Sequence, residues 1–393
     1  MNQKSEFLDR EIVEYIQDNS EPEWMKNQRT EAKARFLSLP NPSFKYGISI
    51  ILNPAEVKFE EIKLPEKKDI NLPVSSKIII KNLSEAFKSH EDLLKKYLFS
   101  TLVSMNKFES LHKMLWNKGV LIYVPKNTFI AEPIKIKNIN GNFDFQHNLI
   151  VVDENSSISI FEEDLSENNE KSYNTKVTEI FVNRDSKLNY AVFQNLSQKT
   201  VNFSSKKALV NQNANITWID FNLGSSLSKS EIYASLQEEG ASTNVFSLFF
   251  SNNSQQFDFN SSIFHNARHT NSDMAVKGVL DNKSKVIYNG LVKIHKNAKN
   301  SNGCQKQDAL ILSPDAEIDP IPNLEIDNND VKCFHGTSIS QLDKDKLFYL
   351  KSRGIPEKEA ANLMIRGFFD PIIEKINLKE AQEDLRNAVS SKL

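Results

Sequence analysis

The spacing of apolar residues changes twice along the chain and divides it into three regions. Residues 1–118 mostly carry apolar side chains at the three- and four-residue intervals of an amphipathic helix. Residues 119–338 alternate apolar and polar positions in short runs such as "SISIFEED", "KLNYAVFQN" and "NITWIDFNL", which are typical of β-strands. Residues 339–393 return to helical spacing. We therefore expect a mainly β protein with an N-terminal helical domain, a β core and a C-terminal helical segment.

Similar turns precede the strands of the middle region. Each begins with a turn-type residue, or with lysine in one case, followed by a small residue and then usually a branched apolar one. The repeats are "NSSIS" at Asn155, "DSKLN" at Asp185, "NANIT" at Asn213, "GASTN" at Gly240, "KSKVI" at Lys283 and "DAEID" at Asp315. The early intervals are about 28 residues, and repetition on this scale indicates stacked coils. The pattern favours a parallel β-helix, in which each coil covers the next.

A β-sandwich is the alternative architecture for the same strands. It would join neighbouring strands by tight hairpins, for which Asn-Gly is a strong sequence signal. That dipeptide occurs at Asn140, Asn289 and Asn302. The pattern by itself therefore favours the β-helix without excluding the sandwich.

Composition and charge narrow the class of protein. Lys and Arg number 49 and Asp and Glu 51, for a formal net charge of −2. This balance argues against a general nucleic-acid binder, which is usually basic. The N-terminus shows no apolar signal-peptide region, and no window approaches the roughly 18 apolar residues of a membrane span. The 2 cysteines cannot form a disulfide framework, so we expect free thiols and a cytoplasmic location.

Cys333 and His335 are the main candidates for site chemistry. If their segment is a strand, positions i and i+2 point to one face, which the thiol and the imidazole would share. An adjacent imidazolium lowers the pKa of a thiol, a thiolate binds iron or accepts sulfane sulfur, and a neutral imidazole is a common metal ligand. The alternative is a buried cysteine that behaves as a small apolar residue near a satisfied histidine. A Cys–His hydrolase would need an orienting group and oxyanion donors that the sequence does not reveal.

The second thiol and a pair of histidines are weaker candidates. Cys304 precedes Cys333 by about one repeat interval, which would place the two on neighbouring coils. The segment "HNARH" puts His265 and His269 at the i,i+4 spacing of helical metal ligands, but it falls between predicted strands and has no evident third ligand. An incidental thiol and two separate histidines are the favoured interpretation.

Three carboxylates alternate along one predicted strand, at Asp315, Glu317 and Asp319. On one face they would suit a cation or the acid pair of a sugar-cleaving β-helix. A solvated face with Ile318 turned inward is the simpler interpretation. The chain has neither G-x-x-x-x-G-K-[ST] nor G-x-G-x-x-G, so any ATP that is involved must be bound by another chain.

The C-terminal third of the chain resembles a known family. Its segments "LILSPDAEID", "DVKCFHG" and "LFYLKSRGI", with "EPEWMKNQR" and "LPNP" near the N-terminus, are similar to the SufB/SufD family of iron–sulfur cluster assembly proteins. The resemblance spans nearly the whole chain and is weakest between residues 45 and 240. The Cys-x-His-Gly at Cys333, His335 and Gly336 looks like the SufD branch, whereas the SufB branch is expected to place a glutamate–histidine pair here. No family role passes to Cys304.

The resemblance implies a right-handed parallel β-helix flanked by an N-terminal helical domain and C-terminal helices. It implies a non-catalytic scaffold subunit that pairs with a SufB-like chain, or with itself, and helps to build a transient iron–sulfur cluster from sulfur delivered by a cysteine desulfurase. Cys333 and His335 would lie at that interface and handle iron or cluster. Whether a flavin supplies electrons stays open, and neither nucleic acid nor a membrane is an implied partner.

The resemblance also implies that the C-terminal helices hold SufC, an ABC-type ATPase. The apolar residues that we expect to contact it are Leu347, Phe348, Tyr349, Leu363 and Phe368. Two rival interpretations stay open at this point: a carbohydrate-active β-helix enzyme, and a purely structural partner that contributes surface but no ligand.

Overall fold

Two long sheets form the centre of the molecule. A computed structural model describes residues 11–17, 21–40, 59, 62–102 and 106–392. Sheet A has nine strands, namely β1 (Ile79–Asn82), β2 (Lys118–Val124), β4 (Phe143–Val152), β6 (Ser172–Val182), β8 (Thr200–Val210), β10 (Leu227–Leu236), β12 (Gln256–His265), β14 (Lys285–Ile294) and β16 (Glu317–Ile326). Sheet B has eight, namely β3 (Ile134–Asn140), β5 (Ser157–Ser166), β7 (Lys187–Asn195), β9 (Asn215–Asn222), β11 (Ser242–Ser251), β13 (Asn271–Leu280), β15 (Ser301–Ile311) and β17 (Val331–Ser340).

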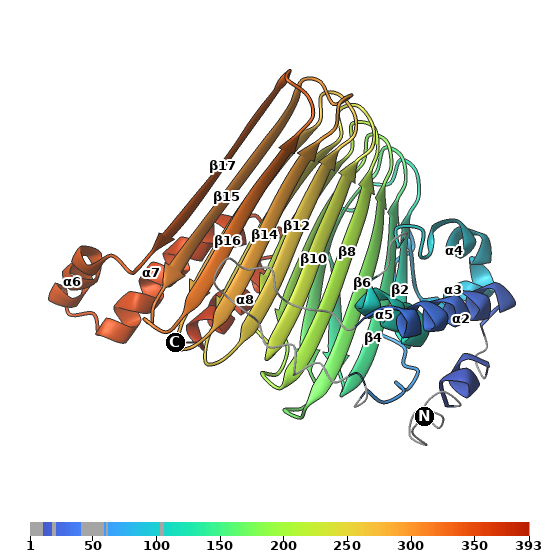
Figure 1. The fold of residues 1–393 in the computed structure, drawn as a ribbon, viewed down its shortest axis with the longest axis horizontal. Helices are drawn as coiled ribbons and strands as arrows, with labels where there is room; N and C mark the ends of the chain where they lie inside the picture. Colours follow the sequence, from blue (N-terminus) through green and yellow to red (C-terminus); the bar gives the residue numbers. More distant parts are fainter. Residues whose placement is uncertain (1–10, 18–20, 41–58, 60–61, 103–105, 393) are drawn as a thin grey trace.

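The strands alternate between the two sheets from β2 onward, so the chain winds as a parallel β-helix (Figure 1). Neighbouring strands within each sheet run parallel, and β1 with β2 is the one antiparallel pair among the described strands. The predicted β-helix is thus confirmed and the sandwich is wrong. Asn289 and Asn302 lie inside β14 and β15, and Asn140 ends β3 before the chain crosses to the other sheet, so none begins a hairpin.

Four of the six predicted turns, at Asn155, Asp185, Asn213 and Gly240, share a conformational cause that does not extend to Lys283 or Asp315. In the turn that leads into each strand of sheet B from β5 to β15, a single residue adopts a left-handed backbone conformation. It lies two positions before the strand, or one position before in the case of β15. These residues are Asn155, Asp185, Asn213, Gly240, His269 and Asn300. Asn, Asp and Gly tolerate this conformation better than other residues do. The residue that follows is small and buried in every case, as Ser156, Ser186, Ala214, Ala241, Thr270 and Ser301. A larger side chain there would collide with the next coil, because close-packed coils leave no room.

Side chains of both sheets fill the interior of the solenoid. One apolar row crosses sheet A in register, through Ile122, Ile150, Ile180, Ala208, Ala234, Ile263 and Val292. All of these residues are buried. Because parallel in-register coils stack like residues on like, a single inward position repeated along the sequence produces a continuous core.

The N-terminal helices cover the outer face of sheet A. They are α2 (Glu23–Ser38), α3 (Leu83–Ser89), α4 (Glu91–Tyr97) and α5 (Lys107–Leu115). Arg29 of α2 is fully buried, where it pairs with both carboxylate oxygens of Glu21 at 2.7 Å and donates to the carbonyls of Met114 and Trp116. This contact fastens α2 to the segment that leads from α5 into β2.

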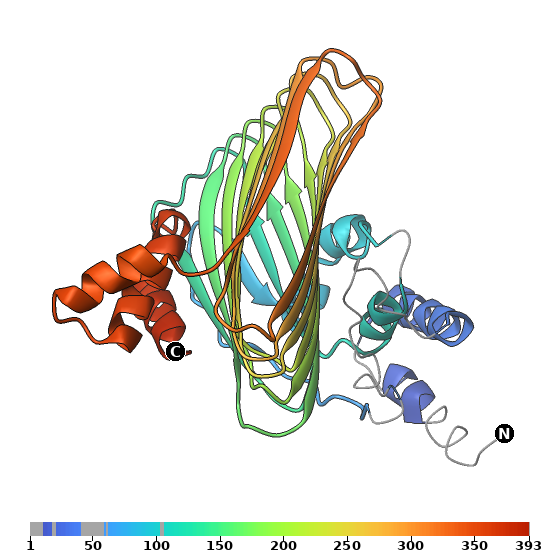
Figure 2. The same cartoon turned by 60° about the vertical axis from the view of Figure 1, so that its left-hand side comes forward.

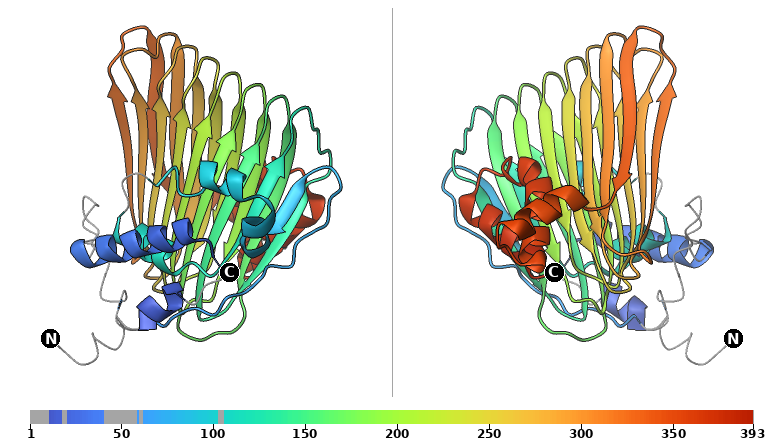
Figure 3. Two further views of the ribbon diagram at one scale, coloured as in Figure 1. Left: turned by 90° about the vertical axis from the view of Figure 1, so that its right-hand side faces the viewer. Right: turned by 90° about the vertical axis from the view of Figure 1, so that its left-hand side faces the viewer.

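The C-terminal helices cover the opposite face of the solenoid, as Figures 2 and 3 show. They are α6 (Lys344–Ser352), α7 (Glu357–Ile373) and α8 (Lys379–Ser390). Ile365, Phe369 and Leu385 pack with Phe221 and Phe250 of sheet B in one buried cluster. In contrast, α6 has no buried residue and extends away from the solenoid (Figure 1). No helix in the described part of the chain is long and apolar enough to cross a membrane.

Candidate functional site

The last strand, β17, is an exposed edge of sheet B. It pairs with β15 on one side, and on the other side no strand of the described part of the chain pairs with it. Most of its residues are exposed, including Phe334, whose side chain is 64% exposed, and Ile339. Edge strands with apolar surface are ready to pair with another chain, and proteins usually protect them. β17 is therefore an unprotected edge with exposed apolar surface.

Cys333 and His335 lie on the same face of β17. In the register with β15, Cys333 stands opposite Gly303 and His335 stands opposite Gln305, and both partners point into the solenoid. The half-buried Cys333 packs with Val292 and neighbouring apolar side chains, whereas His335 is exposed. The strand thus brings the thiol and the imidazole to one face, at the open end of the solenoid.

The neutral thiol is the favoured form of Cys333 in the chain by itself. Burial raises the pKa of Cys333, and a hydrogen bond from the Gly303 backbone opposes that effect without reversing it. This direction is opposite to our expectation of a pKa lowered by an adjacent imidazolium, because burial is the larger effect. A metal ion at this site would have to displace the thiol proton, as thiolate coordination generally does.

The two thiols lie on neighbouring coils but on opposite faces. Cys304 stands opposite Phe334 on the outer face, one position from the Gly303–Cys333 pair, so the predicted adjacency of coils is confirmed. Burial and the carboxylate of Asp273 raise the pKa of Cys304 to about 11. The two sulfur atoms therefore cannot act on one ligand within this subunit.

The histidine pair of "HNARH" is divided between two environments. His265 ends β12 and is fully buried, with Nδ1 2.8 Å from Thr270 Oγ1 and Nε2 2.9 Å from Ser272 Oγ. His269 lies in the following turn, exposed, 3.9 Å from Glu239. Nowhere in the described residues do three or more His, Cys, Asp or Glu side chains form a group that could hold a metal ion. His265 therefore has a structural role in the turn.

The stability of the protein should fall between pH 6.5 and pH 4 through His265. Burial lowers its pKa to about 4, so over that range the unfolded chain binds a proton that the folded chain does not. The loss amounts to about 3 kcal/mol, since each unit of pKa shift corresponds to about 1.4 kcal/mol. Denaturant unfolding at both pH values should show this difference between the wild type and His265→Gln. Equal pH dependence in the two proteins would contradict the assignment.

The alternating carboxylates do not assemble a site. Asp315 lies exposed in the turn before β16, Glu317 is ion-paired with Lys285 at 3.1 Å, and Ile318 packs against the apolar interior. Asp319 is nearly buried. The predicted inward turn of Ile318 is confirmed, and the structure offers no open pair of acids for sugar cleavage among these three residues.

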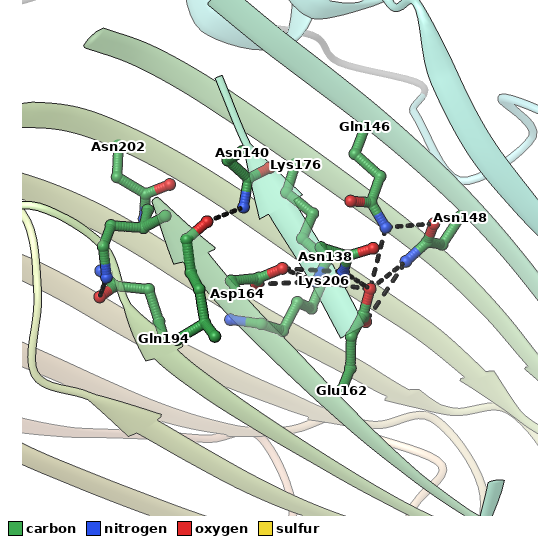
Figure 4. Close-up of polar contacts among 12 residues, drawn as sticks. Asn138, Asn140, Gln146, Asn148, Glu162, Asp164, Lys176, Gln194, Asn202 and Lys206 are labelled. Atoms are coloured by element: carbon green, nitrogen blue, oxygen red, sulfur yellow. Dashed lines mark hydrogen bonds and ion pairs between the residues drawn. The ribbon is translucent and has the colours of Figure 1, made fainter. Parts of the chain in front are cut away.

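A buried charge cluster inside the first coils was missed at the sequence level (Figure 4). It consists of Glu162 and Asp164 of β5 and Lys176 of β6, and Lys176 Nζ lies 2.8 Å from an oxygen of each carboxylate. Glu162 also accepts hydrogen bonds from Asn138 at 2.6 Å and from Asn148 at 3.0 Å. These donors satisfy the cluster inside a closed coil.

Glu162 and Lys176 stay ionised despite their burial. Burial by itself would raise the pKa of Glu162, but Lys176 and the surrounding donors outweigh it and the pKa is lowered. Burial would likewise lower the pKa of Lys176, and the two carboxylates raise it instead. The signal in the sequence is the alternation of "SISIFEED", where Ile158, Ile160, Glu162 and Asp164 all occupy inward positions. If only apolar residues are taken to point inward, the charged inward positions at the end of this strand are overlooked.

Two protein-family matches together cover the β-solenoid and most of the helices that flank it. Residues 135–368 match the SufBD core domain of the SUF system of FeS cluster assembly, and residues 58–136 match the SufBD protein N-terminal region. The chain belongs to the SufBD family of iron–sulfur cluster assembly proteins. Its SufBD core match begins in β3 and ends within α7, so it includes the last coil with Cys333 and His335.

Full-length relatives of this SufBD-family chain occur in staphylococci. The iron–sulfur cluster assembly SufBD family protein of Staphylococcus saprophyticus is 30% identical, over 96% of this chain and 91% of the relative. Proteins of the same description from Staphylococcus haemolyticus and Staphylococcus aureus are also 30% identical, with similar coverage. The similarity thus extends over both flanking helical parts as well as the solenoid.

Proposed function

We propose that this chain is a SufD-type scaffold subunit of a cytoplasmic complex that builds iron–sulfur clusters, with Cys333 and His335 as its contribution to the site. The observation that supports this role most is the placement of a thiol and an imidazole on one face of an exposed terminal strand. Thiolate and imidazole are the ligand types that iron and iron–sulfur clusters take from proteins. The chain acts without catalysing a reaction of its own, and the cluster is its cargo.

The open end of the solenoid is the surface that we propose for a SufB-like partner. Phe334, Ile339 and Ile326 are exposed large apolar side chains on the last two strands. A partner solenoid placed against them would bury this surface and close the space in front of His335. Enclosure protects a nascent cluster from solvent and sets the dielectric around its ligands. A second copy of this chain is the alternative partner.

Sulfur and electrons reach such a site from outside this chain. A cysteine desulfurase would supply the sulfur, and a flavin bound elsewhere in the complex is one source of electrons. ATP hydrolysis would take place in a SufC-like ABC ATPase, since this sequence lacks a phosphate-binding loop. These assignments concern the partners, and the contribution of this chain is the surface and the two side chains.

The exposed part of the C-terminal helices is the proposed ATPase surface. Phe348 is 73% exposed on α6, and Tyr349 and Leu363 are also exposed. Leu347 is partly buried. Phe368 lies in a different environment, packed against the buried cluster of α7 and sheet B with Lys277 Nζ 4.6 Å from its ring centroid. We therefore place the centre of the contact on Phe348 rather than on Phe368.

Replacing Phe348 by serine should abolish co-purification of the ATPase and leave the fold intact, because no buried residue of α6 is lost. Removal of the whole segment after Gly354 is a poorer test, since it would expose the apolar face that α7 covers on sheet B. Lys358→Ser, an exposed polar change early in α7, is the matched control. Undiminished ATPase binding by the Phe348 variant would contradict this surface.

Co-expression with SufB-like and SufC-like chains tests the proposed function as a whole. We expect a stable complex that develops the visible absorption of an iron–sulfur cluster after anaerobic loading with iron and sulfide. A chain that co-purifies with neither partner, or a complex that takes up no cluster, would contradict the proposal.

A further inference from the structure

Two buried glutamines lie directly beneath the proposed site. Gln305 and Gln307 of β15 point into the solenoid, where their side chains are 0% and 3% exposed. In the register with the last strand, Gln305 stands under His335 and Gln307 under Thr337. Neither side-chain oxygen nor nitrogen of these two residues has a hydrogen-bond partner among the described residues. A buried amide without partners costs stability and calls for an explanation.

The register neighbours of the two glutamines are apolar on the coil below and polar on the coil above. On the coil below, their register neighbours are the buried apolar residues Met274 and Val276. Across the interior lies Gly290, where a Cβ would come within 2.2 Å of Gln305 Oε1 and within 2.9 Å of Gln307 Nε2. The absence of a side chain at Gly290 makes room for both amides. On the coil above, their register neighbours are His335 and Thr337, which both carry polar groups.

We propose that Gln305 is a positioning residue for His335: its side-chain oxygen accepts the ring N–H of the imidazole and so directs the other ring nitrogen to the metal. Gln307, which reaches the same point beside Gly290, completes the polar wall under the site. Neighbouring strands lie about 4.8 Å apart, so a rotation of the two side chains brings ring and amide into contact. Histidines that bind metals generally donate their second ring N–H to such an acceptor.

This inference rests on the proposed function, in which His335 is a ligand for iron. It also explains why two amides are kept in an otherwise apolar coil at a cost in stability. A merely structural role and a positioning role can be separated with one substitution, because only positioning predicts an effect on iron binding. Gln305→Met keeps the length of the side chain and removes the amide, so both roles predict equal or higher thermal stability. Positioning additionally predicts weaker iron binding.

The test measures Fe²⁺ affinity of the complex with its partners and the thermal unfolding midpoint of the full chain. We expect Gln305→Met to weaken Fe²⁺ binding by about tenfold or more, the usual effect of losing a residue that orients a ligand, while the unfolding midpoint stays or rises. Gln305→Glu keeps an oxygen acceptor and should retain affinity. Thr243→Val is the matched control, because Thr243 is also buried with a hydroxyl that has no hydrogen-bond partner among the described residues, and its strand β11 lies two strands from β15 in the same sheet.

Comparison with His335→Ala tests the positioning role of Gln305 separately from the proposed function of the chain. If His335→Ala abolishes Fe²⁺ binding while Gln305→Met binds as the wild type does, the positioning role is wrong and the proposed function stands. If the wild-type complex binds no Fe²⁺, or if His335→Ala binds it normally, the proposed function fails and the role of Gln305 fails with it.

Discussion

Replacing Lys176 by methionine should lower the free energy of unfolding by about 3–5 kcal/mol, the typical effect of removing one partner from a buried ion pair. The ammonium group lies 2.8 Å from Glu162 and 2.8 Å from Asp164 inside the solenoid. Without it, the two buried carboxylates lose the ammonium group that pairs with both of them. Their desolvation and mutual repulsion then act against folding. Denaturant unfolding of the full chain measures the loss.

Two comparison variants isolate the electrostatic cause. Lys126 forms an ion pair of similar length with Glu154, 2.9 Å apart on the exposed surface, so Lys126→Met should have a far smaller effect because solvent screens that pair. Adding Glu162→Gln and Asp164→Asn to Lys176→Met removes the unpaired charges and should restore part of the stability. If Lys176→Met and Lys126→Met were equally stable, the buried cluster would not be ionised as described.

Replacing His335 by alanine should reduce cluster formation by about tenfold or more without affecting folding or complex assembly. The imidazole is exposed on the edge strand, so its removal leaves no cavity in the core. Its loss takes away the nitrogen ligand that we assign to this chain. Cluster yield is measured from the visible absorption of the co-expressed complex after anaerobic loading with iron and sulfide.

Lys332→Ala is the control for His335→Ala. Lys332 is exposed on the same strand, but its position alternates with Cys333 and so faces away from the solenoid interior. Its loss should leave cluster yield unchanged. Undiminished yield in the His335 variant would remove the imidazole from the site and favour a purely structural partner role for the chain.

The local features of the fold could be predicted because their causes lie within a few residues. Asp343 caps α6 by accepting from the backbone N–H groups of Asp345 and Lys346, as its position before a helical run predicts. Gly354 ends that helix in a left-handed conformation, and Pro356 precedes α7. Most turn residues of the coils follow the same logic, because Asn, Asp and Gly tolerate a left-handed backbone best, although His269 adopts it too.

The same-face placement of Cys333 and His335 also followed from local periodicity. The sequence could not show whether Cys333 and His335 face the interior of the solenoid or the solvent. That depends on the register of β17 against β15 and on the side chains of the other sheet. The burial that raises the pKa of Cys333 comes from Val292 and its neighbours on another sheet. Contacts between residues so distant in the chain leave no trace in a single local pattern.

The polar interior was missed for a related reason. Glu162 and Asp164 continue the inward alternation of Ile158 and Ile160, but as charged residues they resemble an exposed strand end. Lys176, which pairs with both carboxylates, comes from the next strand and cannot be identified from the pattern within β5. Gln305 and Gln307 were overlooked in the same way. Inward polar residues such as these contradict the rule that alternation marks a buried apolar face.

Pulsed electron paramagnetic resonance of the reduced, cluster-loaded complex tests the central claim most directly. With ¹⁵N-histidine incorporated into this chain alone, our account predicts a nitrogen coupling to the iron that disappears in His335→Ala and persists in Lys332→Ala. A wild-type spectrum without that coupling, or a coupling that survives the loss of His335, would contradict the assignment of this imidazole to the cluster site.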